Sequence, residues 1–381
     1  MSSNIPPKYE TSYNDYRSDT FTIPTRELWD QVYESSVGDT IYQEDTDTCL
    51  LETRIAQEFL GGEMYGGQKA AGLFCMSTTM SNQLAIRALL NRAPPYSLLC
   101  DRRTHVFANE CAGIAVLSQA LVITVEPSNG HHLTLEDIKA NYIPGNYNTQ
   151  VAPTRVISLE NTLHGMCFPL LEMQRISEWA HSEGILLHLD GARLWNAVAV
   201  SNEENKLEYM KKISKCFDSI SLCFTKSIGA PVGSIIVGGT EFIERARHIQ
   251  KQQGGGLRQA GFLARIVNHC INKNFPDVIA TVSNKTAAFW KDLRSELIES
   301  YGLELKLQHP VETNFIFIDL EASNISLKKF LEFGEANNVK FFNNGRIAFH
   351  FQNIGDDGLK LLKQVFIDIA RYYAETPIKT A

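Results

Sequence analysis

Short apolar runs alternate along this chain with longer segments whose apolar residues recur every three or four positions. The short runs predict buried strands, because a strand covered on both faces reads as a continuous apolar stretch. The predicted strands are residues 71–76, 97–100, 121–125, 155–159, 184–187, 219–222 and 234–237. The last of these is expected to turn back. Since strands and helical patterns alternate, we expect an α/β fold.

Amphipathic segments between these runs predict the helices. Thr25 is expected to cap a helix that carries Leu28, Trp29, Val32 and Tyr33 on one face and ends by Gly38. Further helices are predicted at residues 47–60, 78–90, 134–141 and 170–182, and around residues 242–249.

The C-terminal third has the pattern of a separate, smaller α/β unit. Pro276 breaks a helix, and a long helix then runs through residue 297. A strand at 314–318, a helix at 326–336, a strand at about 346–351 and a closing helix follow. We therefore expect an N-terminal arm over residues 1–16, a large domain over 17–270 and a small domain over 271–381.

Composition is that of an ordinary globular protein, with 381 residues, 44% hydrophobic and 21% charged. A net charge of −7 and the lack of a basic stripe argue against nucleic acid as a partner. No apolar signal core or run long enough for a membrane is found. The eight cysteines form no Cys-x-x-Cys pair, which favours free thiols and no metal site. We expect a cytoplasmic protein that binds no membrane.

An acid and an amine follow neighbouring strands of the predicted sheet. Asp190 lies where the run at 184–187 ends, and Lys226 lies just past the run at 219–222. Pyridoxal 5′-phosphate (PLP) needs a lysine for a Schiff base and a carboxylate that keeps its ring nitrogen protonated. Asp190 and Lys226 are therefore candidate catalytic residues of a PLP site. Taken singly, each has a structural alternative, since Asp often caps a helix and Lys is often a surface charge.

Two small-residue loops are candidate phosphate sites. Ser77, Thr78 and Thr79 follow a strand and open a helix, where free backbone N–H groups and the helix dipole attract an anion. Simple helix capping is the alternative. Three glycines at 254–256 precede Arg258, and this second loop is either a phosphate cradle or a flexible linker.

Together these motifs resemble the fold-type I PLP enzymes, and more narrowly the threonine aldolase family, over nearly the whole chain. The supporting segments are RSDT at 17–20, SLENT at 158–162, DGAR at 190–193, Lys226 with GAPVGS at 229–234, and GGGLRQ at 254–259. The resemblance implies an aspartate aminotransferase-like large domain with a mostly parallel sheet, and a smaller C-terminal α/β domain.

The resemblance also implies roles for single residues. His105 would stack on the cofactor ring and take part in catalysis. Arg258 would reach the phosphate, either in its own subunit or in a neighbouring one. Ser18, Arg193 and Arg346 would bind the substrate carboxylate, with Arg193 counted in the cofactor site too. A planar guanidinium suits a carboxylate because it binds in a bidentate manner.

Subunits are expected to share active sites, so the resemblance implies a homodimer or homotetramer. Tyr42 would contribute to the substrate site at a place where subunits meet over the cofactor.

The chain departs from the family at three positions. Gln43 and Thr78 stand where the family usually has glycine, and Gln150 stands where many members have a histidine taken to assist aldol cleavage. Thr78 either reshapes its loop or adds a hydroxyl donor to the phosphate. Glutamine does not titrate, so it cannot transfer a proton at that position. His164 follows a predicted strand and is a second candidate acid–base, because residues after strand ends line the site in open α/β sheets.

The function implied by the resemblance is cleavage of L-threonine or L-allo-threonine, β-hydroxy-α-amino acids, to glycine and an aldehyde. This would place the lyase in amino-acid metabolism and glycine biosynthesis. An amino-acid racemase on the same scaffold, acting on alanine, is the alternative, because some fungal members of the family are racemases. A non-catalytic PLP-binding paralogue is a third hypothesis, disfavoured by the joint presence of Asp190, Lys226, Arg193 and Arg258.

Overall fold

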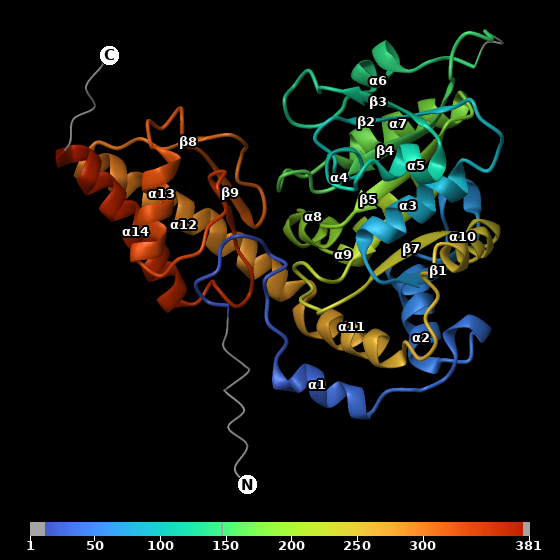
Figure 1. Ribbon diagram of the computed structural model, residues 1–381, viewed down its shortest axis with the longest axis horizontal. Helices are drawn as coiled ribbons and strands as arrows, with labels where there is room; N and C mark the ends of the chain where they lie inside the picture. Colours follow the sequence, from blue (N-terminus) through green and yellow to red (C-terminus); the bar gives the residue numbers. More distant parts are fainter. Residues whose placement is uncertain (1–11, 146–147, 376–381) are drawn as a thin grey trace.

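A seven-stranded sheet flanked by helices forms the larger part of the molecule, and a three-stranded sheet forms the C-terminal part (Figure 1). The computed structural model describes residues 12–145 and 148–375. The strands of the large sheet are β1 (Ala70–Cys75), β2 (Ser97–Asp101), β3 (Leu121–Val125), β4 (Thr154–Glu160), β5 (Leu186–Gly191), β6 (Ser219–Cys223) and β7 (Ser234–Gly239).

The strand order is β1-β7-β6-β5-β4-β2-β3. β3, β2, β4, β5 and β6 run parallel, while β7 is antiparallel to both β6 and β1. The mostly parallel sheet and the turn-back strand are confirmed. The carboxyl ends of β2, β4, β5 and β6 therefore open onto one edge of the sheet, which is where ligands bind in such folds.

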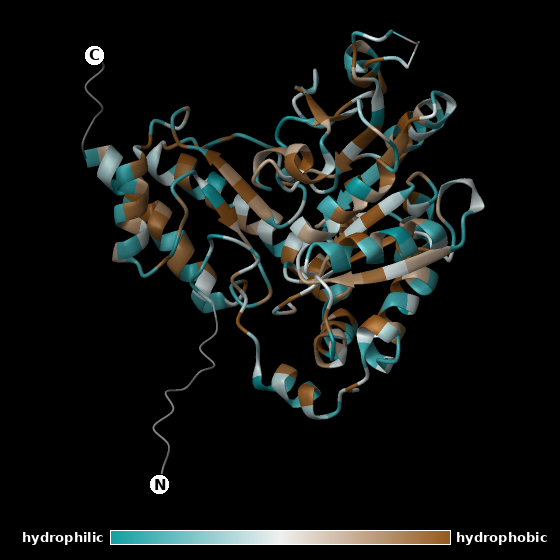
Figure 2. Cartoon of the chain, turned by 45° about the vertical axis from the view of Figure 1, so that its right-hand side comes forward, coloured by the Kyte–Doolittle hydropathy of each residue, from teal (hydrophilic) through white to brown (hydrophobic). Residues whose placement is uncertain are grey.

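Helices cover both faces of this sheet. The helices of this part are α1 (Arg26–Tyr33), α2 (Thr46–Arg54), α3 (Thr78–Leu89), α4 (His105–Ala108), α5 (Gly113–Ser118), α6 (Leu135–Asn141), α7 (Leu170–Ser182), α8 (Leu194–Val200), α9 (Lys206–Ser214), α10 (Thr240–Gln252) and α11 (Gly261–Asn274). Of these, α1 packs on α11 (Figure 1). Successive strand residues point into different cores, since Leu98 and Cys100 belong to one buried cluster and Leu99 to the other. Figure 2 accordingly shows mostly brown strands.

The C-terminal sheet consists of the antiparallel strands β10, β9 and β8, in that order. Its elements are β8 (Lys306–Leu307), β9 (Phe315–Asp319), β10 (Arg346–Ala348), α12 (Asp277–Tyr301), α13 (Leu327–Ala336) and α14 (Asp356–Glu375). Tyr16 is fully buried in this hydrophobic core, and its backbone hydrogen-bonds to Lys340 and Ala348. Residues 1–11 of the expected arm lie outside the described residues, and the domain division at residue 270 stays a prediction.

Two expectations about single elements are wrong. The first helix ends at Tyr33 rather than near Gly38. Of its apolar stripe only Leu28 is fully buried, whereas Trp29 and Tyr33 are exposed. The strand predicted to reach residue 351 stops at Ala348, because the chain turns where the Asn353 N–H donates to the carbonyl of His350. Among the described helices, none combines the length and apolar character of a bilayer span.

Candidate active site

Four side chains converge at the carboxyl edge of the large sheet. Asp190 lies near the end of β5 and is paired in register with Glu160, the last residue of β4. Lys226 follows the end of β6 by three residues, and His105 begins α4 shortly after β2. The local sequence predicts these positions, because each residue lies at the end of a buried apolar run or within a few residues of it.

The Asp190 carboxylate is fully buried and held from two sides. One oxygen accepts a hydrogen bond from the Ala192 N–H (3.0 Å), and the other accepts from the Asn82 side-chain amide (2.8 Å). The Asn82 carbonyl oxygen lies 3.1 Å from Nε2 of His188. Burial lowers the pKa of His188 to about 4, so this imidazole is neutral and donates its Nε2–H to Asn82. The network fixes the orientation of Asp190.

His105 is attached to the same network through Glu110. Its Nδ1 lies 2.7 Å from Oε1 of Glu110, and that oxygen also accepts from Asn82 (3.0 Å). The backbone N–H of His105 donates to Glu160 (2.6 Å), and 39% of its side chain remains exposed. The ring is therefore anchored through Nδ1 and partly exposed, which is compatible with stacking on a cofactor.

Sequence reasoning missed Asn82 and Glu110 as site residues. Asn82 stands in a buried stretch of α3, where a residue of low helix propensity is a weak hint of a polar role. Glu110 is 3% exposed and follows His105 by five positions. His105, Glu110 and Asp190 offer ligand atoms within 4.8 Å of one another, but Asn82 bridges the two carboxylates, so we interpret the group as a hydrogen-bond network.

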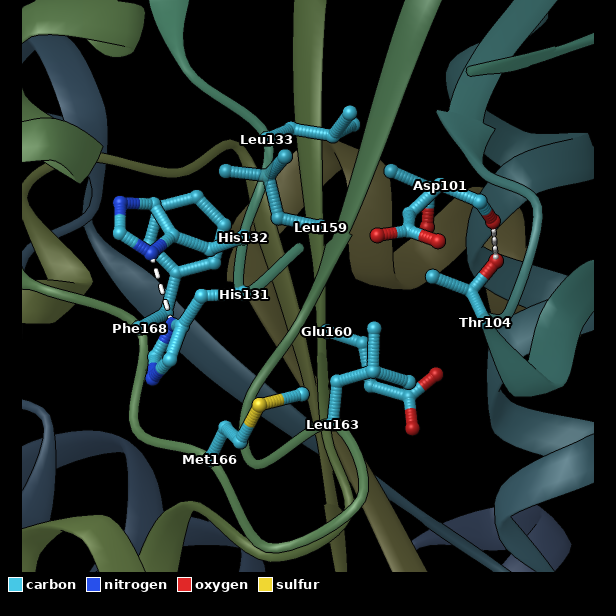
Figure 3. Close-up of a pocket in the computed structure, with 11 residues that line it drawn as sticks. Asp101, Thr104, His131, His132, Leu133, Leu159, Glu160, Leu163, Met166 and Phe168 are labelled. Carbon is cyan, nitrogen blue, oxygen red and sulfur yellow. Dashed lines mark hydrogen bonds between the residues drawn. The ribbon is translucent and has the colours of Figure 1, made fainter. Parts of the chain in front are cut away.

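Glu160 adds a third carboxyl to this edge, and its side chain is half-buried. Burial and the neighbouring Asp190 raise the pKa of Glu160 to about 8, although the hydrogen bond from His105 and the charge of Lys226 oppose the shift. Glu160 lines a small cavity together with Asp101, Thr104, Leu163, Met166 and other residues (Figure 3). Glu160 is thus mainly protonated at neutral pH.

The loop between β1 and α3 has the features of an anion site. Ser77 caps α3 and accepts a hydrogen bond from the Met80 N–H (3.2 Å). Thr78 is the first helical residue and is buried, yet its Oγ1 has no hydrogen-bond partner among the described residues. Thr79 is exposed beside it. The N–H groups of a first helical turn lack intrahelical partners, so this loop fits a phosphate.

Two arginines meet near the N-terminal segment. The Arg193 guanidinium donates to both oxygens of Asp19 (2.8 and 2.7 Å), and Arg346 donates to Oγ of Ser18 (3.1 Å). Both guanidinium groups lie 4.7 Å from the centre of the Phe315 ring. Ser18, Arg193 and Arg346 are therefore brought together, as the resemblance implied.

This arginine pair carries an excess of positive charge. Asp19 is fully buried, which alone would raise its pKa, but Arg193, Arg346 and Lys226 outweigh burial and lower it below the usual range. Burial and the repulsion of Arg193 lower the pKa of Arg346 to about 10, and Nε of Arg346 has no partner among the described residues. The site therefore fits a small carboxylate.

Tyr42 and Arg258 lie together but away from these groups. The Arg258 guanidinium donates to Asp39 (2.8 Å) and lies 6.0 Å from the Tyr42 ring centre. Tyr42 is 70% exposed, and Arg258 is exposed too. Their predicted roles need a second subunit and stay predictions.

Gln150 is exposed on its loop, where its backbone N–H donates to Asn148 (3.0 Å). His164, in contrast, is half-buried, and its Nδ1 lies 3.0 Å from Nε2 of His309 in the C-terminal part. His309 has no distinguishing sequence motif, so only the structure reveals the pair.

Comparisons of the sequence with known proteins find matches over most of the chain. The family model for beta-eliminating lyases matches residues 15–323. The chain is 45% identical over 374 residues to the low-specificity L-threonine aldolase of Saccharomyces cerevisiae, covering 98% of this chain and 90% of that protein. It is also 32% identical over 358 residues to an alanine racemase of Cochliobolus carbonum, covering 94% of this chain and 87% of that protein.

The fold has solved counterparts as well. The threonine aldolase structure of Leishmania major superposes with a TM-score of 0.72 at 20% identity, covering 93% of this chain and 99% of that one. At this identity the likeness concerns the fold, and it supports the expected fold-type I architecture.

Proposed function

This chain belongs to the beta-eliminating lyase family, and on that premise we propose that it is a PLP-dependent aldolase. It would cleave L-threonine and L-allo-threonine, as β-hydroxy-α-amino acids, to glycine and acetaldehyde. The similarity to several low-specificity L-threonine aldolases supports this reaction.

The observation that carries the proposal is the arrangement of Arg193 and Arg346 around Phe315, with an unpartnered Nε on Arg346. A small anionic substrate group would offset the charge that Asp19 alone leaves uncompensated. The positive charge of Lys226 also contributes to the lowered pKa of Asp19. A substrate that carries both a carboxylate and an amine thus suits this set of charged groups.

The residues at the sheet edge fit PLP. Lys226 would hold it through its amine, Asp190 through the ring nitrogen, His105 through the ring face, and Ser77, Thr78 and Thr79 through the phosphate. The buried Oγ1 of Thr78, which lacks a partner among the described residues, is consistent with this assignment. When bound, PLP supplies an electron sink for the pair released at the substrate α-carbon.

The protein itself decides which bond is cleaved. Ser18, Arg193 and Arg346 fix the substrate carboxylate, and thereby which substituent of the α-carbon is aligned for cleavage. Hydrogen bonds from Asn82 and Ala192 hold the Asp190 carboxylate in one orientation, beside the position proposed for the cofactor ring. The free energy gained by binding the carboxylate thus holds the substrate in the orientation needed for bond cleavage.

The test is incubation of PLP-loaded protein with L-threonine, L-allo-threonine and L-alanine in separate reactions. We expect acetaldehyde from the first two, measured by coupled reduction, and no D-alanine in the third, measured by chiral chromatography. D-alanine with little acetaldehyde would instead support the racemase alternative, which the similarity to the Cochliobolus carbonum racemase keeps open. Absence of both products would contradict catalysis.

We propose further that the protein forms a homodimer or homotetramer. Tyr42 and Arg258 are exposed in the single chain, as are Trp29 and Tyr33 of α1, which is expected of surfaces that a second subunit covers. An active monomer in light scattering would contradict this proposal.

A cytoplasmic location is proposed from the cysteines. All eight are unpaired thiols, and five of them are buried. Free buried thiols are typical of a reducing compartment. Fractionation of cells that express the tagged protein would test the location.

A further inference from the structure

The hairpin that follows β4 is fastened to the segment that leads into β9. Nδ1 of His164 contacts Nε2 of His309, the Thr313 hydroxyl donates to the carbonyl of Gly165 (2.8 Å), and the Cys167 N–H donates to Glu312 (2.7 Å). These contacts join parts of the chain about 145 residues apart. They place His164 between the edge of the large sheet and the C-terminal sheet.

This position is next to the arginine pair. A methyl group at Gly165 would come within 3.1 Å of Cβ of Phe315, whose ring both arginines contact. The Phe317 ring centre lies 5.4 Å from that of His164 and 5.3 Å from that of His309. Phe317 is also the register partner of Arg346 across β9 and β10. The two imidazoles therefore border the carboxylate site.

We infer that His164, paired with His309, is the acid–base that accepts the β-hydroxyl proton of the substrate, an assignment that rests on the proposed aldolase function. The Nε2 of His164 takes the proton, and the O–H electron pair forms the carbonyl of the departing aldehyde. The Cα–Cβ bond breaks, and its electrons remain with the α-carbon fragment. That fragment later gains one proton and leaves as glycine, so no proton is consumed overall.

The pairing suits this role because it fixes the tautomer of His164. When His164 donates its Nδ1–H to Nε2 of His309, its own Nε2 is left as the nitrogen that accepts a proton. The pair also supplies a titratable group that Gln150 lacks. His105 is not assigned this role, because its Nδ1 is bound to Glu110 and its ring is proposed to stack on the cofactor.

Surrounding charges make the basicity of His164 depend on whether the substrate carboxylate is bound. Burial, His309 and Arg103 lower the pKa of His164 to about 4, Arg346 adds to this, and Asp101 opposes it. The pKa of His309 is lowered in turn by burial, Arg103 and His131. A carboxylate bound at Arg346 offsets one positive neighbour and raises the basicity of His164.

The experiment uses His164→Asn and His309→Gln, with His248→Asn on the exposed side of α10 as the control. Asparagine suits position 164 because φ is +52° there, a left-handed conformation that Asn tolerates. Each PLP-loaded variant is assayed for acetaldehyde release from L-threonine. It is also assayed for exchange of the glycine α-proton with deuterated water by NMR, which needs the arginines and Lys226 but no base at the β-carbon.

We expect acetaldehyde release to fall roughly 100-fold or more in both variants, in the range typical of a lost general base. Glycine exchange and the His248→Asn control should remain at the wild-type rate. In the apoprotein, His309→Gln should raise the NMR-detected pKa of His164, because a positive neighbour is removed.

The outcomes separate the two proposals. Wild-type protein that releases no acetaldehyde refutes the aldolase function. Wild-type cleavage with an undiminished rate in His164→Asn overturns the inference alone. Equal loss of cleavage and glycine exchange in both variants also overturns it, since the pair would then be structural.

Discussion

Thr78 is a residue where the chain departs from its family and where the structure offers a reason. The Thr78 side chain is buried at the first position of α3, and its hydroxyl has no partner among the described residues. Burying a hydroxyl without a hydrogen-bond partner costs free energy, unless a bound ligand supplies that partner. Of the two readings of the departure, an added hydroxyl donor to the phosphate is the one that the geometry favours.

Thr78→Val removes this donor while keeping the shape of the side chain. We expect the dissociation constant of the apoprotein for PLP to rise roughly 10- to 100-fold, since a hydrogen bond to a charged group is worth about 1.5–3 kcal/mol. Absorbance or fluorescence titration measures it. Thr78→Ser, which keeps the hydroxyl, should bind nearly as wild type; equal affinities of the Val and Ser variants would exclude the phosphate contact.

Gln43 shows a different kind of departure. Its φ of +58° lies in the left-handed region, which explains why glycine is usual there in the family. Gln43 is exposed at the end of a short 3₁₀ turn, so the strain is local. This departure therefore needs no catalytic explanation.

At the scale of elements, the close approach of β5 and β6 positions the site. Gly191 follows Asp190, and a methyl group at Gly191 would come within 2.8 Å of the Ser221 carbonyl oxygen and 3.1 Å of a Leu222 methyl. The glycine of the DGAR motif is thus required by strand packing. It lets Asp190 and the segment that carries Lys226 lie side by side.

Gly191→Ala should therefore separate β5 from β6. We expect the free energy of unfolding of the apoprotein to fall by about 1–3 kcal/mol, as overpacking of a dense interior does, and PLP affinity to fall with it. Urea unfolding measures the first effect. Gly355→Ala is the control, because a methyl group there meets no atom within 4 Å. If Gly191→Ala unfolds with the same free energy as the wild type, the strands can move apart without cost and the packing argument is wrong.

At the scale of the whole molecule, buried ionisable groups tie stability to pH. The pKa of Glu160 is raised to about 8 in the folded protein, mainly by burial, against an ordinary value of 4.5. Its contribution to stability is complete below pH 4.5 and is lost progressively as the pH rises through 8, since the unfolded chain ionises first. Asp19 acts in the opposite sense: its lowered pKa contributes stability above about pH 4, which is lost as the pH falls.

Glu160→Gln imitates the protonated carboxyl at every pH. The melting temperature of the apoprotein variant, relative to wild type, should rise steadily between pH 5 and pH 8, because only the wild type loses stability through Glu160 there. Differential scanning fluorimetry across this range tests it. Glu178→Gln, at an exposed position of α7, should show no such trend. A constant difference for Glu160→Gln would mean that the carboxyl is ionised throughout.

The surface of α1 bears on assembly. Trp29 is 46% and Tyr33 87% exposed, although both belong to the apolar stripe of the helix. Because such side chains on a single subunit often mark an interface, we expect the double variant Trp29→Ala, Tyr33→Ala to form smaller oligomers in light scattering than wild type. Leu171→Ala, 76% exposed on α7, is the control. An unchanged mass of the double variant would place the interface elsewhere.

The sequence by itself determined the order of strands and helices and the positions of Asp190, Lys226, His105 and Thr78. These features are local: an apolar run forms a buried strand, and a polar residue just past it lies at the edge of the sheet. The Asp190–Lys226 pair therefore follows from periodicity and chemistry, while the roles of Ser18, Arg193 and Arg346 came from the family resemblance.

Only the tertiary structure decided which distant side chains meet. Asn82 reaches Asp190 across 108 positions, His164 reaches His309 across 145, and Arg193 reaches Asp19 across 174. The exposure of Trp29 was decided at the same level. Periodicity fixes which side of an element is apolar, but which element covers that side, and which polar groups are buried together, depends on how the whole chain packs.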